Sequence, residues 1–123
     1  MDTQGIKELL QAYFDASYKA NAGEMATVFH EAARIYGYFG EGKLVDMDKT
    51  AFVKRIEARA ATPDSNNPDY RRVSEILSIE FLGEDVAYAT VKMSVADAVY
   101  KDILSIVRLD GKWGIIAKLF AKA

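Results

Sequence analysis

The chain contains no cysteine, and this absence removes several classes of site at once. Disulfides, thiolate nucleophiles and thiolate metal ligands are all excluded. A single histidine among the 123 residues also excludes a zinc site built from several imidazoles. The sequence has no glycine-rich phosphate loop and no Gly-x-Ser-x-Gly nucleophile motif. We therefore expect no metal and no cofactor.

The chain also has no large excess of charge of either sign. It contains 16 lysines and arginines and 18 acidic residues, so the net charge is −2. No basic run or aromatic-and-basic stretch is present, so we expect no nucleic-acid partner. No apolar run approaches the roughly 20 residues that cross a bilayer. The first residues, Met-Asp-Thr-Gln-Gly, lack the basic and apolar segments of a signal peptide. A soluble, cytoplasmic protein without a membrane partner is the expectation.

Proline is scarce, and both copies fall in residues 62–69, which therefore predict a loop. Helical patterns precede this loop and long strand patterns follow it. Half of the residues are hydrophobic and 28% are charged, which is typical of a globular chain. We predict one domain over residues 1–123, of the α+β class, with helices packed on one face of a sheet.

The first half begins with an amphipathic pattern that predicts a helix over residues 3–22, ended by Gly23. Its apolar face is rich in aromatic rings, which suit either a packed core or the roof of a pocket. A second short helix is expected from Glu24 to about Phe29, with His30 at its end. Two short strands follow, over residues 34–39 and 43–45.

A third helix of about three turns is expected to begin at Asp48. The Asp48 side chain can cap the helix, and Met47 and Phe52 occupy the positions of a hydrophobic staple.

The second half predicts an antiparallel meander, because tight turns separate its strand patterns. On one strand, alternate residues from Ala87 to Val95 are apolar, and the opposite face is only partly polar. Such a sheet favours helices on one side and a second copy of the chain on the other, although a monomer with a Thr- and Tyr-rich face is the alternative. The expected strands are residues 71–82, 86–96, 99–109 and 112–122.

Asp110-Gly111 gives the strongest hairpin signal. A two-residue turn pairs Trp113 with Arg108 and Leu119 with Asp102, whereas a three-residue turn with a bulge shifts this register by one residue. Lys118 is interpreted as a lysine at the sheet surface.

Asp102 and His30 are the candidates for chemistry. Asp102 shares a strand face with Leu104 and Ile106, so its carboxylate is paired, protonated or facing a cavity if those residues are buried. A strand end that reaches solvent is the alternative. His30 could act with Asp102 as an acid–base pair, or it could simply cap or pack at a helix end.

Four stretches of the sequence carry a resemblance to a known superfamily. They are Leu10-x-x-Tyr-Phe, Val28-Phe-His-Glu-Ala32, Tyr100-x-Asp-x-Leu-x-Ile, and Asp110-Gly-Lys-Trp-Gly-Ile-Ile-Ala-Lys-Leu-Phe120. With the order of elements, they make nearly the whole chain resemble the nuclear transport factor 2-like superfamily, near its SnoaL-like and putative lumazine-binding members.

This resemblance implies a cone-shaped, strongly curved antiparallel sheet wrapped around three helices, with a pocket inside and frequent homodimers through the sheet. Relatives include isomerases, dehydratases, cyclases and epoxide hydrolases, alongside members that only bind. The ketosteroid-isomerase pattern has a carboxylate base in the first strand, where this chain has Ile35-Tyr-Gly-Tyr38. The pocket residues implied are Tyr13, Phe14, Tyr18, His30, Tyr36, Tyr38, Tyr100, Asp102 and Trp113.

Three functions follow from these observations. The first is a small-molecule binding protein with an internal pocket for an aromatic or carbonyl-type ligand. The second is a cofactor-free dehydratase or isomerase that uses His30 and Asp102. The third is a dimeric interaction module that uses its sheet face.

Overall fold

The computed structural model of the chain describes residues 1–62 and 67–123. Part of the predicted loop, residues 63–66, therefore lies outside the described residues. Helices come first and the long strands last, which confirms the α+β class. The elements are α1 (Thr3–Tyr18), α2 (Ala22–Val28), β1 (Phe29–Tyr38), β2 (Leu44–Asp48), α3 (Lys49–Ala60), β3 (Ser74–Phe81), β4 (Val86–Val95), β5 (Ala98–Leu109) and β6 (Lys112–Lys122).

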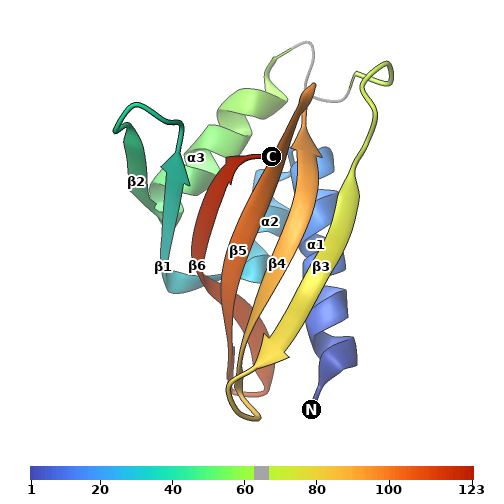
Figure 1. The fold of residues 1–123 in the computed structure, drawn as a ribbon, viewed down its shortest axis with the longest axis vertical. Coiled ribbons are helices and arrows are strands. Elements are labelled where there is room, and N and C mark those ends of the chain that lie inside the picture. Colours follow the sequence, from blue (N-terminus) through green and yellow to red (C-terminus); the bar gives the residue numbers. More distant parts are fainter. Residues whose placement is uncertain (63–66) are drawn as a thin grey trace.

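Within the described ranges the strands form one six-stranded sheet in the order β2-β1-β6-β5-β4-β3. The helices lie together on one side of this curved sheet (Figure 1). The meander of β3 to β6 is confirmed, because each of its neighbouring pairs is antiparallel. The expectation of a wholly antiparallel sheet is wrong at one place, because β1 runs parallel to β6. The chain between them contains β2, α3 and the strands β3 to β5, and the last strand returns to lie beside the first.

Helix α1 ends earlier than the sequence pattern indicates. Asp2 caps its start by accepting a hydrogen bond from the backbone N–H of Gly5. Its last helical residue is Tyr18, and Ala20 then adopts a positive φ of 51°. An alanine therefore occupies the left-handed position that Gly23 was expected to fill, and Gly23 lies inside α2.

The segment around His30 differs from the prediction in the same way. Helix α2 ends at Val28, and Phe29 already belongs to β1, where it pairs with Ile115 of β6. His30 is thus a strand residue and not the end of a helix. The pairing of β1 with β6 is irregular between Phe29 and Arg34, so the chain bends just after this point.

Helix α3 begins where the sequence places it. The Asp48 side chain accepts a hydrogen bond of 2.8 Å from the backbone N–H of Ala51. Met47 and Phe52 on either side of the cap are both buried, as a hydrophobic staple requires.

The hairpin of β5 and β6 combines both predicted registers. Asp110 and Gly111 have φ values of 51° and 77°, so they form a two-residue turn, and Trp113 pairs with Arg108. A β-bulge then interrupts β6 at Ile116, because Ile106 pairs with Ile115 but Ser105 pairs with Ala117. Beyond it the register expected from a two-residue turn alone no longer holds, and the pairing is shifted by one residue, as in the alternative with a bulge.

The bulge changes which side chains of β6 face the helices. Before it, Trp113 and Ile115 are buried, and after it the inward positions fall on Lys118 and Phe120. Asp102 consequently pairs with Phe120 and not with Leu119. Because of this one extra residue, Lys118 lies on the concave face of the sheet and not at the surface, where it was expected.

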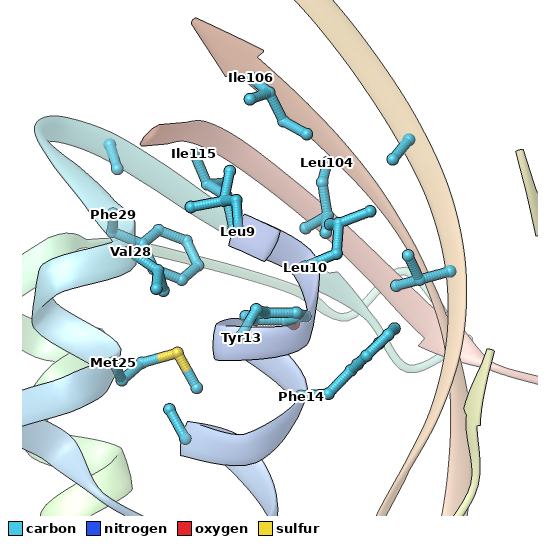
Figure 2. Close-up of a cluster of buried hydrophobic side chains, with 14 of the residues drawn as sticks. Leu9, Leu10, Tyr13, Phe14, Met25, Val28, Phe29, Leu104, Ile106 and Ile115 are labelled. Carbon is cyan, nitrogen blue, oxygen red and sulfur yellow. The ribbon is translucent and has the colours of Figure 1, made fainter. Parts of the chain in front are cut away.

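The core lies between α1 and the concave side of the sheet. Leu10, Tyr13 and Phe14 of α1 project among side chains of α2 and the strands (Figure 2). The alternation predicted for β4 is confirmed, because Ala87, Ala89, Val91 and Met93 are all at most 3% exposed. Phe52 and Ile56 of α3 also belong to this core, and a hollow remains beside them.

Candidate functional site

A cavity of about 190 Å³ opens between α3 and the concave side of the sheet. An apolar cavity of about 150 Å³ is known to hold a benzene molecule, so this space suits one aromatic ring with a small substituent. Apolar side chains form most of the wall, and the polar side chains come from α1, α3, β5 and β6. The lining residues are Ser17, Phe39, Met47, Phe52, Arg55, Ile56, Arg59, Met93, Val95, Tyr100, Asp102, Lys118 and Phe120.

Asp102 is the buried carboxylate of this wall. Its side chain is only 1% exposed, and β5 places it on the same inward face as Leu104 and Ile106. The Tyr13 hydroxyl donates a hydrogen bond of 2.6 Å to Asp102 Oδ2. Burial and the adjacent carboxylate together raise the pKa of Tyr13 well above its usual value, so the phenol stays protonated as the donor.

Lys118 is the second buried charge. Its side chain is 11% exposed, and Nζ lies 4.0 Å from Asp102 Oδ2. The rings of Phe52, Phe120 and Tyr13 surround Nζ at 4.8, 5.0 and 5.3 Å from their centroids. Burial lowers the pKa of Lys118, although the charge of Asp102 opposes that shift. The pair thus places an ammonium and a carboxylate in a largely apolar wall.

Two arginines of α3 complete the polar lining. Arg59 Nη2 donates to the backbone oxygen of Ser17 at 2.7 Å and lies 3.5 Å from the Ser17 hydroxyl. Arg59 Nε is buried and has no hydrogen-bond partner in residues 1–62 and 67–123. Burial lowers the pKa of Arg59, and the neighbouring charge of Arg55 contributes to that shift. Arg55 itself is exposed, one helical turn before Arg59.

Of the predicted pocket residues, Tyr100 and Asp102 line this cavity. Tyr13 lies behind the wall and reaches it through the hydrogen bond to Asp102. Phe14 is 4% exposed and belongs to the core next to Tyr13, with ring centroids 6.0 Å apart. The aromatic face of α1 therefore serves mainly as core, one of the two readings that the sequence left open.

The structure does not bring His30 and Asp102 together. His30 lines a different surface hollow, with Trp113 and Gly114, and its Nδ1 accepts a hydrogen bond from the backbone N–H of Ala32. Trp113 there donates through Nε1 to Asp2 Oδ2 at 2.8 Å. On β6, Trp113 of the hollow with His30 and Lys118 of the cavity with Asp102 are about five residues apart. This spacing corresponds to roughly 16 Å along a strand.

The remaining tyrosines also lie outside the cavity. Tyr18 borders a small hollow, where the Arg72 guanidinium stacks 4.3 Å from its ring centroid. Tyr36 and Tyr38 alternate with the buried Ile35 and Gly37, so they project from the opposite face of the sheet.

Sequence reasoning missed the three cations of the site. Lys118 was assigned to the surface because the bulge at Ile116 has no clear mark in the sequence. Arg55 and Arg59 are spaced by four residues on α3, a signal that they share a helix face, but the sequence does not show that this face borders a hollow.

No group of three or more His, Cys, Asp or Glu side chains in residues 1–62 and 67–123 is arranged to hold a metal ion. The helices of this same part of the chain are all too short or too polar to cross a membrane.

Comparisons with solved structures identify the fold. An NTF2-like protein of unknown function from Methylobacillus flagellatus KT shares 28% identity, with 99% of this chain and 92% of that chain covered and a TM-score of 0.79. An NTF2-like protein of unknown function from Silicibacter pomeroyi DSS-3 has a TM-score of 0.81 at 21% identity, with 98% and 94% of the chains covered. A ketosteroid isomerase-like protein from Erwinia carotovora atroseptica SCRI1043 has a TM-score of 0.72 at 12% identity over 99% and 98% of the chains.

A comparison with curated proteins found no match. The family described as putative lumazine-binding matches residues 1–121, which is nearly the whole chain. The chain has the nuclear transport factor 2-like fold and belongs to the putative lumazine-binding family.

Proposed function

We propose that the protein binds a small aromatic or carbonyl-containing molecule in the cavity between α3 and the sheet. The observation that carries this proposal is the buried Asp102–Lys118 pair in an otherwise largely apolar wall. Ligand sites combine apolar walls with a few convergent polar groups that orient the ligand. The family description and the fold support the same function.

A thermal-shift screen tests this function with single-ring aromatic acids, amides and ketones, and with lumazine, for which the family is named. A ligand present at about 100 times its dissociation constant stabilises the fold by roughly 2.7 kcal/mol. A matched pair of variants assigns the response to the cavity. Val95→Phe fills the cavity and should abolish the shift, whereas Val86→Phe, at an exposed position of β4, should preserve it. An equal response in both variants would place binding elsewhere.

Asp102 also supports a second candidate, cofactor-free isomerase or dehydratase chemistry. A buried carboxylate can accept a proton from a bound carbonyl compound. Since His30 lines another hollow, the proton donors beside Asp102 are Lys118 and Tyr13. Deuterium exchange at the α-carbon of cyclohexanone, followed by NMR in heavy water, tests this candidate. Exchange that is no faster with the wild type than with Asp102→Asn would eliminate it.

We further propose a homodimer through the outer face of the sheet. Thr90, Ile103, Leu119 and Tyr36 lie in register across four strands, and Ile103 and Leu119 are 49% and 44% exposed. Such a row of partly apolar side chains is typical of a protein interface.

Sedimentation of the wild type and of Ile103→Lys tests the dimer. The wild type should sediment as a dimer and the variant as a folded monomer. A monomeric wild type would refute this arrangement, and with it the interpretation of the protein as a dimeric interaction module.

A further inference from the structure

We infer that the cavity selects anionic ligands, of the class of a single aromatic ring that carries a carboxylate. This inference rests on the proposed small-molecule function and names the charge of its ligand. The lining contains the three cationic side chains of Arg55, Arg59 and Lys118 and the single carboxylate of Asp102. With these four groups ionised, the lining carries an excess of two positive charges.

The carboxylate of Asp102 does not neutralise the whole cluster. It already accepts the hydrogen bond of Tyr13 and lies next to Lys118, so its charge is committed to those partners. Arg55 forms no ion pair with a described residue, and neither does Arg59. The two arginines on α3 thus lack a counter-charge within the described protein.

The cations also disfavour one another. Burial is the main cause of the lowered pKa values of Lys118 and Arg59. Beyond it, Arg59 and Arg55 both lower the pKa of Lys118, and Arg55 lowers that of Arg59. Such shifts mean that each positive charge raises the free energy of its neighbours. An anion in the cavity would relieve this repulsion, whereas a neutral ligand would not and a cation would increase it.

Arg59 has N–H donors that can form hydrogen bonds to the anion. A guanidinium has five N–H donors, and the hydrogen bonds of Arg59 to described residues come from Nη2 alone. Its buried Nε has no acceptor among the described residues, so this N–H is available to a ligand. A carboxylate can accept two parallel hydrogen bonds from such a group after a small adjustment of the side chain.

The apolar wall fits the rest of such a ligand. Phe52, Met93, Val95 and Phe120 line the same cavity and can contact an aromatic ring, while the carboxylate lies towards α3. The volume of about 190 Å³ suits a benzoate-sized molecule. The structure thus combines a site for a ring with a site for an anionic substituent.

Calorimetric titration of benzoate, benzamide and benzylamine tests the inference, because the three probes share a ring and differ in charge. Benzoate should bind at least about tenfold more tightly than benzamide, as expected for hydrogen bonds to a charged group, and benzylamine should bind most weakly. The preference for benzoate should decrease as salt is added, because the contact is partly electrostatic.

Arg59→Met removes the guanidinium but keeps an apolar side chain. It should weaken benzoate binding about tenfold and leave benzamide binding nearly unchanged. Arg55→Met, at an exposed position that does not endanger folding, should weaken benzoate binding by a smaller factor. Lys101→Met, an exposed cation outside the cavity lining, is the matched control and should change neither affinity.

The outcomes separate the two proposals. Equal binding of benzoate and benzamide, or an equal loss of both in Arg59→Met, would overturn anion selectivity and leave the small-molecule function in place. Failure of all three probes to bind, together with no response in the thermal-shift screen, would overturn both.

Discussion

The Tyr13 hydroxyl donates a hydrogen bond of 2.6 Å to Asp102 Oδ2 and so ties α1 to β5 across 89 residues of sequence. Both side chains are at most 1% exposed, so neither exchanges this bond for water. Tyr13→Phe removes the donor and leaves Lys118 as the remaining partner of the carboxylate among the described residues. We expect the free energy of unfolding to fall by about 1.5–3 kcal/mol, the usual value for a hydrogen bond to a charged group. Urea denaturation at neutral pH measures it.

The control for this variant is Tyr88→Phe. The Tyr88 hydroxyl also donates to a carboxylate, that of Glu80, but this pair is exposed. Its loss should change stability by less than about 0.5 kcal/mol. Similar losses in the two variants would show that burial does not strengthen the Tyr13–Asp102 bond.

The same pair predicts a dependence of stability on alkaline pH. The pKa of Tyr13 is raised well above its usual value by burial and by Asp102. A raised folded-state pKa contributes stability that is complete below the unfolded pKa of about 10 and is lost as the pH rises above it. The free energy of unfolding of the wild type should therefore fall above about pH 10, and that of Tyr13→Phe should fall less steeply with pH.

A spectroscopic titration of the folded protein gives a second test. Tyr13 should be the last of the seven tyrosines to ionise. Ionisation of all tyrosines together in the folded protein would contradict this.

The effects of substituting Asp102 and Lys118 on the free energy of unfolding should depend on each other. Asp102→Asn leaves the buried ammonium without its counter-charge, and breaking a buried pair in this way costs about 3–5 kcal/mol. Replacing Lys118 by methionine as well removes that unpaired charge. The double variant should therefore be more stable than Asp102→Asn alone, with a coupling energy of about 0.5–3 kcal/mol in a double-mutant cycle. Additive losses would show that the 4.0 Å separation has no energetic consequence.

The fold is more predictable from the sequence than the site, and β6 shows why. Alternating hydrophobicity and the Asp110-Gly111 turn predict the hairpin because both are local signals. The bulge at Ile116 depends on how β6 fits against β5 and β1 at the same time, so its position is a tertiary property. A bulge moves every later side chain of the strand to the opposite face. One unpredicted residue therefore led to the wrong prediction that Lys118 lies at the sheet surface. The position of His30 was missed for a similar reason, because pairing of Phe29 with Ile115 starts β1 earlier than the local pattern indicates.

Gly37 on β1 leaves room for the ring of Phe120, which lines the cavity. A Cβ atom built on it would lie 2.3 Å from Cζ of Phe120, which is too close for any real contact. Gly37→Ala should displace the Phe120 ring, at a cost of about 1–3 kcal/mol, and weaken binding in the cavity. In a Phe120→Leu background the same change should cost less, because the clashing atoms are absent. Denaturation of the four proteins measures the difference, and an equal cost in both backgrounds would contradict this explanation.

The turn between β4 and β5 offers a stabilising substitution. Val95 pairs with Ala98, so Ala96 and Asp97 form the turn, and Ala96 has a positive φ of 52°. Two-residue hairpin turns favour glycine at a first position of positive φ, because a Cβ atom is strained there. Ala96 is exposed, so its methyl group contributes little packing that would be lost. Ala96→Gly should therefore raise the free energy of unfolding by about 0.5–1 kcal/mol and the melting temperature by a few degrees.

Ala98→Gly is the control for this turn, two residues further along the chain. Ala98 lies in β5 with an ordinary strand backbone, so glycine should destabilise the protein by about 0.5–1 kcal/mol. The two alanine-to-glycine changes are thus expected to act in opposite directions. If both lower the melting temperature, the positive φ at Ala96 does not carry the strain assigned to it, and the flexibility that glycine adds to the unfolded chain decides the outcome at both positions.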